Sequence, residues 1–346
     1  MKAVVLKEFG GVEHFKLEEL QDPMPQENEV RISVKSAGFN PVDYKMRKGY
    51  FAGKIPLILG ADCSGVIDAV GKGVTEFAIG DEVYAMPFGQ CSNGSYAEKL
   101  TVPASFVAKK PKQLSFHEAA AIPLAAMTAY RALFASSAVK RGDRVFIAGA
   151  GGGVGCLAVQ MAQHIQAAEI FTVAGSEESA RFLVEAHGLK RQNILIYKGL
   201  TTEQMVEKLI AMNQGELFEA TFDLVGQEMK RLCLQLTKHS GHFATIVPEQ
   251  HAFDFSVWQA GVALTFQRNL SLHFIFVGSE SMFGSKDSWQ IYSRHLKEIS
   301  QMIEKGALKP QKIEVVGNLS VEAVAKAHHL LEEGKVKGKL VMRVQE

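Results

Sequence analysis

Apolar runs and helical repeats alternate regularly through the middle of the chain. Val145 to Ala148 form a short apolar run of the kind that becomes a buried parallel strand. Similar runs recur downstream, separated by segments whose apolar residues repeat at helical spacing. The expected strands are Ile170–Ala174, Ile194–Tyr197, Thr221–Val225 and His242–Val247, and the expected helices are Glu178–Ala186, Thr202–Met212 and Glu228–Lys238. This alternation predicts an α/β domain with a doubly wound parallel sheet.

A glycine-rich turn follows the first of these strands. The sequence GAGGGVG comes directly after Ala148, and a helical pattern begins inside it. A turn between a strand and a helix places backbone N–H groups and the positive end of the helix dipole at one point, which suits a pyrophosphate. The spacing departs from Gly-x-Gly-x-x-Gly only in having alanine at the first position. We expect a dinucleotide to contact Ala150, Gly152, Gly153, Val154 and Gly155.

The turn after the second strand indicates which dinucleotide binds. An NAD site usually carries an acidic residue here to hold the ribose hydroxyls. This chain has Gly175 and Ser176 in the turn, and its two glutamates come only afterwards. Ser176 leaves room for a 2′-phosphate, and Arg181 and Tyr197 are placed to support it. We predict NADPH as the cofactor. The alternative is that Arg181 is a solvated helix residue and the glutamates repel phosphate.

The two ends of the chain predict a second domain. Short β-like runs near the N-terminus are separated by turn signals such as VGKGV and AIGDEV: Ala3–Leu6, Glu29–Ala37, Ser64–Val70, Glu82–Pro87 and Gly94–Val102. They indicate a mostly β domain with a partly open barrel. Near the C-terminus, Ile313–Val316 and Lys339–Val344 are strand-like and Val321–Leu331 is helical. We expect a β domain of residues 1–123 and 266–346, with an inserted cofactor domain of residues 124–265.

Composition narrows the class of protein. The chain has 346 residues, a length that favours two domains. A formal net charge of +1, without a basic stripe interleaved with aromatics, gives no general attraction to nucleic acid or membrane. Apolar runs stay well short of the ~20 residues of a membrane span, and the N-terminus does not resemble a signal peptide. The cysteines lack metal-like spacing and fit a reducing, cytoplasmic location: Cys63, Cys91, Cys156 and Cys233.

A series of motifs resembles one family. AGFNPVDYKMRKGY, LGADCSGVIDAVGKGV, GDEVYAM, GSYAEKLTVPA, AAAIPLAAMTAYRAL and AGAGGGVGCLAVQMA follow one another as in the medium-chain dehydrogenase/reductase superfamily. The chain most resembles the zinc-free branch of quinone oxidoreductases and alkenal (enone) reductases, from Met1 to the closing GKVKGKLVMRV. The resemblance implies a Rossmann domain inserted into a GroES-like catalytic domain. It also implies zinc-independent, NADPH-dependent reduction of quinones or α,β-unsaturated carbonyls.

The resemblance separates this chain from zinc-dependent members. Those carry a cysteine in the loop that is GFNPVD here, and a Gly-His-Glu motif where this chain has Gly60-Ala61-Asp62. Asn40 stands at the cysteine position and Ala61 at the histidine position. A further cysteine expected near Ala125 is also missing. Because a catalytic zinc needs three protein ligands, Cys63 with the neighbouring acid is too few, and we expect no metal.

The same loop supplies the candidate catalytic residues. By resemblance Asn40 faces the nicotinamide, where its amide can donate to the substrate oxygen. Tyr44 and Lys45 are candidate proton donors, and Asp43 would orient one of them. Structural alternatives stay open for each residue. The alternative roles are a turn for Asn40, a helix N-cap for Asp43, a packing residue for Tyr44 and a solvated side chain for Lys45.

The resemblance also implies cofactor contacts outside the glycine turn. Thr128 is expected at the nicotinamide ribose or ring. The remaining candidates follow the last strands of the sheet, and core packing is the alternative role for their side chains: Val225, Gly226, Ile246, Val247, Phe276 and Val277.

The substrate and the assembly are less constrained by the sequence. An apolar cleft could suit a small quinone or enone, lined by Phe39, Phe51, Met86, Phe88, Phe255 and Trp258. An enoyl-thioester reductase, a zinc-type alcohol dehydrogenase and a non-catalytic NADPH-binding protein are the alternatives. The adjacent His328 and His329 are expected at the surface of a terminal helix. The apolar segment NLSLHFIFV is expected to be an edge strand that joins two copies in a homodimer.

Overall fold

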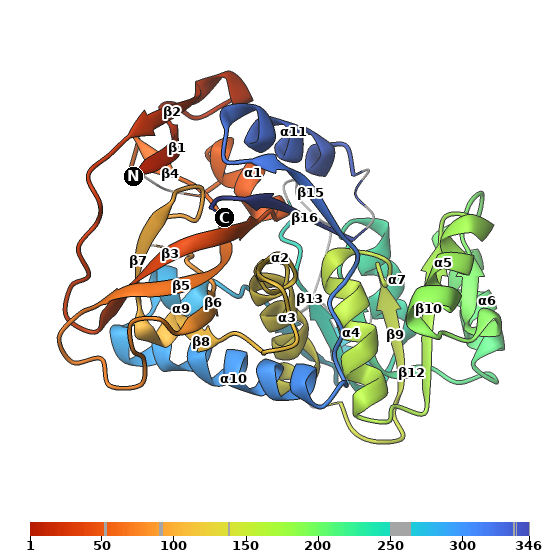
Figure 1. The fold of residues 1–346 in the computed structure, drawn as a ribbon. Helices are drawn as coiled ribbons and strands as arrows, with labels where there is room; N and C mark the ends of the chain where they lie inside the picture. The colour runs from red at the N-terminus through yellow and green to blue at the C-terminus, as the bar shows by residue number, and fades with distance from the viewer. Residues whose placement is uncertain are drawn as a thin grey trace. The chain divides into compact units, whose positions relative to one another are not determined.

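The computed structural model describes residues 1–51, 54–89, 93–137, 139–249, 264–334, 336 and 338–345 (Figure 1). The chain divides into two compact units. The first unit consists of Met1–Met127 and Val277–Glu346, and the second unit is Thr128–Phe276. Three residues considered above lie outside the described part of the chain: Cys91, Phe255 and Trp258.

The second unit contains a six-stranded parallel sheet. Its strands are β9 (Arg144–Ala148), β10 (Glu169–Ala174), β11 (Ile194–Ile196), β12 (Phe218–Asp223), β13 (Thr237–Thr245) and β14 (Ser271–Phe274). Their spatial order is β11-β10-β9-β12-β13-β14. The chain reverses direction across the sheet between β9 and β12, which is where ligands bind in open α/β sheets. The doubly wound fold class is confirmed, and β14 extends the sheet beyond the predicted range of 124–265.

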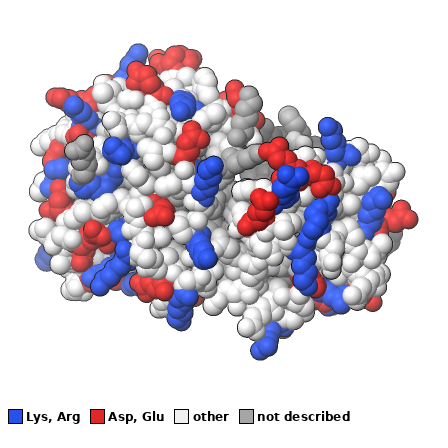
Figure 2. Space-filling model, turned by 45° about the vertical axis from the view of Figure 1, so that its right-hand side comes forward, with Lys and Arg blue, Asp and Glu red and all other residues white. Residues whose placement is uncertain are grey.

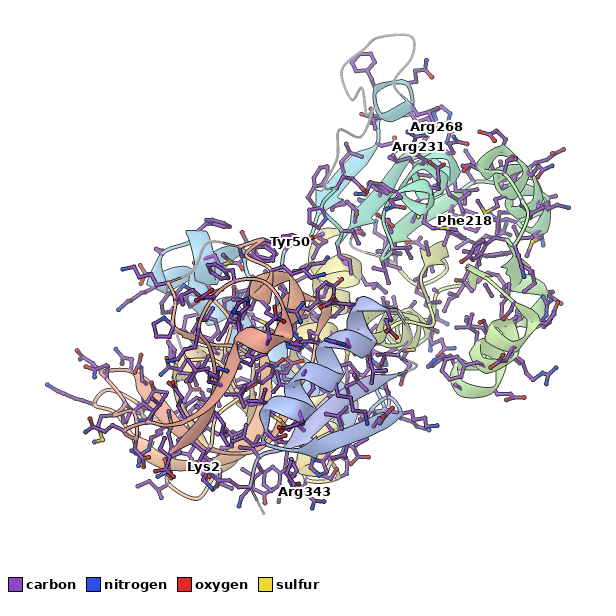
Figure 3. All side chains as sticks on the ribbon, turned by 90° about the horizontal axis from the view of Figure 1, so that it is seen from above. Lys2, Tyr50, Phe218, Arg231, Arg268 and Arg343 are labelled. Carbon is purple, nitrogen blue, oxygen red and sulfur yellow. The ribbon has the colours of Figure 1, made fainter. Side chains whose placement is uncertain are left out.

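Helices connect these strands as the apolar spacing predicts. They are α4 (Gly153–His164), α5 (Glu177–His187), α6 (Thr202–Met212), α7 (Glu228–Leu236) and the short α8 (Leu264–Gln267). The helix α7 ends before Lys238, its predicted end, because β13 already begins at Thr237. In the core of this unit the rings of Phe146 and Phe218 lie 5.8 Å apart, and Figure 3 shows Phe218 among the side chains of this unit.

The first unit is mostly β and contains two sheets. Its strands are β1 (Lys2–Leu6), β2 (Phe15–Glu19), β3 (Glu29–Gly38), β4 (Leu57–Ile58), β5 (Asp62–Val70), β6 (Glu82–Ala85), β7 (Lys99–Pro103), β8 (Val107–Lys109), β15 (Ile313–Asn318) and β16 (Lys339–Arg343). One sheet has the order β2-β1-β4. The other has the order β15-β16-β3-β5-β6-β8, with β7 also paired to β3. The C-terminal strands therefore complete the sheet begun by the N-terminal segment.

One predicted strand of this unit begins later than expected. The segment Gly94–Val102 enters β7 only at Lys99. Its first residues instead bond to the segment around β4, because Gly94 N–H donates to Ile58 O and Tyr96 N–H donates to Leu59 O. This detour fixes Tyr96 in the interior of the unit, where it is fully buried.

The helices of this unit are α1 (Pro41–Arg47), α2 (Phe116–Ala120), α3 (Pro123–Tyr130, which crosses the division between the units), α9 (Ser279–Phe283), α10 (Gln290–Glu304) and α11 (Val321–Glu332). The sequence analysis did not predict α10. Its buried face contains Tyr292, whose ring stacks on Phe106 at 4.4 Å, and Leu296, whose carbonyl accepts the Tyr84 hydroxyl at 2.9 Å.

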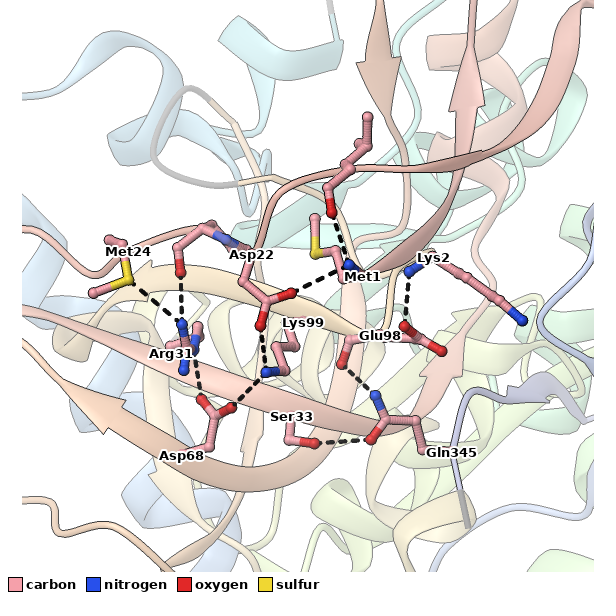
Figure 4. Close-up of polar contacts among 12 residues, drawn as sticks. Met1, Lys2, Asp22, Met24, Arg31, Ser33, Asp68, Glu98, Lys99 and Gln345 are labelled. Atoms are coloured by element: carbon pink, nitrogen blue, oxygen red, sulfur yellow. Dashed lines mark hydrogen bonds and ion pairs between the residues drawn. The ribbon is translucent and has the colours of Figure 1, made fainter.

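Charged side chains of both signs are interspersed over the visible surface (Figure 2). Some of them form a network close to the N-terminus in space. In this network Lys99 Nζ lies 2.5 Å from Asp22 and 3.4 Å from Asp68 (Figure 4). The Lys99 hydrogen bond lowers the pKa of Asp22. Such partly exposed pairs each stabilise a fold only slightly. Within the described ranges, no helix combines the length and the apolar character needed to cross a bilayer.

Candidate functional site

The glycine turn of the second unit builds a helix N-terminus against the end of β9. Gly149 has a φ of +87°, a conformation that favours glycine, and its carbonyl accepts the Gly152 N–H at 3.0 Å. A Cβ on Gly155 would collide with the Gly149 carbonyl oxygen and lie 2.7 Å from the Ala150 Cα. Gly152 is the N-cap of α4. Because the first N–H groups of a helix have no intrahelical acceptor, this turn can bind an anion.

The turn after β10 lies beside Tyr197 and leads into α5, which contains Arg181. Ser176 is the N-cap of α5 and its hydroxyl accepts the Ser179 N–H at 3.2 Å. Arg181 lies on the next turn of α5, is exposed and has no ion pair with any described residue. Tyr197 directly follows β11, its N–H donates to Ala174 O at 3.0 Å, and its hydroxyl lies 3.4 Å from a Cβ built on Gly175.

The next two strand ends contain predicted cofactor contacts and a buried acid, Asp223, that the sequence analysis did not name. Asp223 ends β12 and is fully buried. One carboxylate oxygen accepts the N–H groups of Val225 at 3.0 Å and Gly226 at 2.7 Å, while the other accepts the Thr245 hydroxyl at 2.7 Å. Asp223 therefore shapes the loop after β12 and ties it to β13. The available signal was an acid inside the predicted strand Thr221–Val225.

The remaining predicted cofactor residues lie at element ends. Val225 is 52% exposed, and a Cβ on Gly226 would lie 2.9 Å from Val247. Ile246 and Val247 follow β13 and are half-buried. Thr128 is buried on α3, Phe276 is half-buried and Val277 is buried after β14. The placement of these residues is compatible with their predicted roles, which stay predictions.

In the first unit, Asn40 rather than Asp43 is the N-cap of α1. The helix begins at Pro41, a favoured first position because proline has no N–H to satisfy. The Asp43 carboxylate accepts the Asn40 N–H at 2.7 Å. The hypothesis that Asp43 is the N-cap is therefore wrong. The acid lies in the first turn and bonds back to the residue that precedes the helix.

The Asn40 side chain belongs to a buried polar cluster. Its amide nitrogen donates to Asp62 at 2.8 Å, and its oxygen accepts from Lys339 Nζ at 2.5 Å. Lys339 Nζ lies 3.5 Å from the Asp62 carboxylate, whose other oxygen accepts the Leu124 N–H at 2.7 Å. Burial raises the pKa of Asp62, while Lys339 and the hydrogen bonds from Asn40 and Leu124 lower it.

This cluster does not fit a catalytic zinc. An ammonium group and an amide occupy the surroundings of Asp62, and burial raises the pKa of the adjacent Cys63 thiol. A catalytic zinc needs three protein ligands, and Cys63 with Asp62 supplies only two. Across the described ranges, no group of three or more His, Cys, Asp or Glu side chains is placed to hold a metal ion.

The other candidate catalytic residues are partly accessible. Tyr44 and Lys45 on α1 are half-buried. Burial raises the pKa of Tyr44 and lowers the pKa of Lys45, and Lys48 Nζ lies 5.5 Å from the centre of the Tyr44 ring. Tyr50, shortly after α1, is 53% exposed (Figure 3). Part of each side chain, Tyr44 and Lys45, is therefore accessible to a ligand.

Three members of the predicted apolar cleft are buried: Phe39, Met86 and Phe88. The Phe39 ring packs 5.0 Å from the ring of Tyr96. Phe51 is half-buried, so its predicted role stays open. Phe88 and Asp43 line a cavity of about 20 Å³ together with Gly60 and Ala61. Sequence spacing could not distinguish core aromatics from lining aromatics, because both kinds are apolar and lie close to the same motifs.

His328 corrects another expectation. It lies on α11, but it is fully buried rather than exposed, and its ring packs edge-on against Phe15 at 5.3 Å. Its Nε2 lies 3.3 Å from the Tyr96 hydroxyl. Burial lowers the pKa of His328 to about 3, so the ring is neutral. Of these two adjacent histidines, His329 is the exposed one, as predicted.

Comparison with known proteins places this chain in a family. Residues 26–112 match the alcohol dehydrogenase GroES-like domain, and residues 196–342 match the zinc-binding dehydrogenase family. A solved NAD-dependent alcohol dehydrogenase is 31% identical, with full coverage of both chains and a TM-score of 0.82. The chain belongs to the medium-chain dehydrogenase/reductase superfamily. This confirms the predicted superfamily with its GroES-like and Rossmann domains.

Relatives within the superfamily include quinone oxidoreductases. The human quinone oxidoreductase is 29% identical over 99% of this chain and 97% of its own length. A Pseudomonas syringae quinone oxidoreductase structure has a TM-score of 0.84 at 25% identity, covering 99% of both chains. A mycobacterial protein complexed with NADPH has a TM-score of 0.83 at 25% identity, covering 99% of this chain and all of that chain. These relatives support the quinone oxidoreductase branch.

Other matches are partial. The mouse synaptic vesicle membrane protein VAT-1 homolog-like is 37% identical over 51% of this chain, and the chain spans 42% of that relative. The Lama guanicoe quinone oxidoreductase is 38% identical over 54% of this chain, and the chain spans 56% of that relative.

Proposed function

We propose that the protein is a cytoplasmic, NADPH-dependent reductase of quinones or α,β-unsaturated carbonyls that works without zinc. The observation that carries this proposal is Lys339, whose ammonium group occupies the side-chain cluster of Asn40 and Asp62. A fixed cation beside the acid replaces the charge that a metal would supply. Oxidising an alcohol benefits from a Lewis acid, whereas reducing a polarised C=C bond or a quinone carbonyl does not require one.

The preference for NADPH over NADH is argued from the turn after β10. Ser176 leaves space for a 2′-phosphate, and the unpaired Arg181 can supply the opposite charge. The first glutamate after Ser176 is already engaged, because Glu177 pairs with Arg191 at 2.6 Å. The mycobacterial relative complexed with NADPH supports this choice, while the relative named an NAD-dependent alcohol dehydrogenase supports the other.

The chain's own residues orient the substrate and the cofactor. When bound, the reduced nicotinamide supplies the hydride. The Tyr44 hydroxyl is protonated at neutral pH, since the pKa of a tyrosine is about 10 and burial raises it further, so Tyr44 can donate a hydrogen bond to the substrate oxygen. Lys45 on the same helix is the second candidate donor. The Asn40 amide already donates one N–H to Asp62, so we assign Asn40 chiefly to holding this loop in place.

The test is NADPH oxidation, followed by ultraviolet absorbance, with purified protein after treatment with a chelator. Quinones and α,β-unsaturated ketones and aldehydes are the substrates, and NADH and a saturated aldehyde are the controls. We expect turnover of at least one of the first two classes, insensitive to chelation and faster with NADPH. Activity that appears only with the saturated aldehyde and disappears with the chelator would contradict the proposal. NADPH binding without turnover of any substrate would contradict it as well.

A further inference from the structure

Three titratable residues meet in the interior of the first unit behind the Asn40 loop. Asp43 comes from α1, Tyr96 from the segment before β7 and His328 from α11, and all three are fully buried. The Tyr96 hydroxyl lies 3.3 Å from His328 Nε2. It also interacts with the Asp43 carboxylate. One hydroxyl therefore stands between a buried acid and a buried imidazole.

The two oxygens of Asp43 have different surroundings. Oδ2 accepts the Asn40 N–H at 2.7 Å and is fixed by the start of α1. Oδ1 is buried and has no hydrogen bond of ordinary geometry with a described residue. Asp43 also lines the cavity of about 20 Å³ beside Gly60 and Ala61. A cavity of that size holds one water molecule when polar partners are present. Oδ1 is thus the oxygen that can carry a proton.

The Tyr96 hydroxyl has two possible partners but only one proton. When Asp43 is ionised, the hydroxyl donates to the carboxylate. When Asp43 is protonated, the hydroxyl is free to donate to His328 Nε2, since the neutral imidazole can present an acceptor there. His328 Nδ1 has no partner in the described structure, so its tautomer is not fixed from the other side.

Neighbouring charged residues also shift the pKa values of Asp43 and His328. Asp62 raises the pKa of Asp43 and Lys339 lowers it, but burial outweighs both and brings the value to about 7. Arg47 and His329 lower the pKa of His328 further after burial. Arg47 is itself paired with Glu332 on α11. At neutral pH, Asp43 is therefore the member of the trio that changes its charge.

We propose that Tyr96 and His328 are positioning residues that hold Asp43 as the proton donor of the reduction. This inference rests on the proposed function. Reduction of an enone adds a hydride to one carbon and a proton to its neighbour. The Oδ1–H bond of Asp43 breaks and its proton passes to the cavity water, which releases one of its own protons toward the substrate carbon. The resulting carboxylate accepts the Tyr96 hydroxyl proton in a hydrogen bond and is reprotonated from solvent before the next cycle.

The two positioning residues have opposite expected effects. Tyr96→Phe removes a donor that favours the ionised carboxylate, so the pKa of Asp43 should rise. His328→Phe keeps an aromatic ring against Phe15 but removes the competing acceptor. The Tyr96 hydroxyl then always donates to Asp43, so the pKa of Asp43 should fall. If Tyr96 and His328 only filled the core, the two substitutions would not shift the pKa of Asp43 in opposite directions.

The experiment measures kcat/KM against pH with NADPH and the best enone. The proteins are wild type, Tyr96→Phe, His328→Phe and the control Tyr84→Phe, which removes another buried hydroxyl that bonds Leu296 O. Wild-type kcat/KM should fall as pH rises through the pKa of Asp43. The apparent pKa at which kcat/KM falls should be higher by roughly half a pH unit or more in Tyr96→Phe and lower in His328→Phe. It should be unchanged in Tyr84→Phe. Coincident profiles, or equal shifts in all three variants, would overturn the proposal.

A second measurement separates this inference from the proposed function. The pKa of Asp43 is followed by carbon NMR of the carboxyl groups, with Asp43→Asn to assign the signal. The shifts expected for Tyr96→Phe and His328→Phe should appear here even in a protein that turns over no substrate. NMR shifts without turnover would contradict the proposed function and the donor role together, and would leave only the coupling of the trio. Turnover with no NMR shift would contradict the coupling alone.

Discussion

Lys339 Nζ lies 2.5 Å from Asn40 Oδ1, so the strand β16 holds the loop that contains the candidate catalytic residues. The two residues are far apart in sequence, but β16 pairs with β3 and thereby brings Lys339 next to the end of β3. The lysine is nearly fully buried, as are Asn40 and Asp62. This arrangement makes the loop depend on one buried cation.

Lys339→Met should destabilise the protein strongly. The change leaves the Asp62 carboxylate buried without its ion pair, which costs on the order of 3–5 kcal/mol. Lys339→Met with Asp62→Asn should recover part of that loss, because the uncompensated charge is then gone. Urea unfolding of the single and double variants measures both effects. Lys110→Met is the control, a buried lysine of the same unit paired with Glu82 at 3.1 Å. A single variant as stable as wild type would show that the pair contributes little.

Gly155→Ala should weaken dinucleotide binding. The added Cβ would collide with the Gly149 carbonyl oxygen and approach the Ala150 Cα, and neither backbone atom can move without changing the turn. Gly151→Ala is a matched control in the same turn, since its Cβ would meet only Leu183 at 3.8 Å. We expect NADPH affinity to fall by about tenfold or more in the first variant, roughly 1.4 kcal/mol, and little in the second. Fluorescence titration measures both, and equal affinities would refute the assigned turn.

Ser176→Asp should shift the cofactor preference from NADPH toward NADH. Aspartate is as good an N-cap as serine, so α5 should still form, but its charge repels a 2′-phosphate and can hold ribose hydroxyls. We expect the ratio of kcat/KM for NADPH to that for NADH to fall by at least about tenfold.

Arg181→Ala should lower the same ratio by weakening NADPH alone. Arg141→Ala is the control for a lost surface charge. Arg141 is exposed and lies just before the start of β9, whereas the glycine turn follows the end of β9. If neither Ser176→Asp nor Arg181→Ala changes the ratio, the 2′-phosphate is not bound at this turn.

The sequence predicted the second unit well because its signals are local. The bounds of α6 matched, and the glycine turn was found from a strand, a glycine cluster and a helical repeat that lie next to one another. The buried trio could not be found in this way. His328 is buried because Tyr96 and Phe15 pack against it, and neither residue is near it in sequence. Lys339 likewise carries no local sign that it pairs with Asp62.

Asp43→Asn should flatten the dependence of stability on pH. Burial raises the pKa of Asp43 in the folded state to about 7, well above that of an exposed aspartate, so the folded state binds this proton more tightly than the unfolded state does. This proton increases the free energy of unfolding by roughly 2–4 kcal/mol. The contribution is fully present below about pH 4 and is lost as the pH rises through about 7. Urea unfolding at pH 5 and pH 7.5 should show a smaller difference in the variant than in wild type. Asp143→Asn, at a surface loop, should leave the difference unchanged.

The edge strand β14 provides the last prediction, which concerns the proposed homodimer. β14 pairs with β13 on one side, and Phe274 on it is 71% exposed. Among the described residues no strand pairs with its other edge, and such an edge with an exposed aromatic is a favourable surface for a second copy of the same strand. We expect wild type to have twice the mass of one chain by light scattering. Phe274→Lys should give the monomer mass. Phe283→Lys, which changes a phenylalanine that is 77% exposed on α9, should remain dimeric. A monomeric wild type, or a dimer that survives Phe274→Lys, would show that this edge does not join two copies.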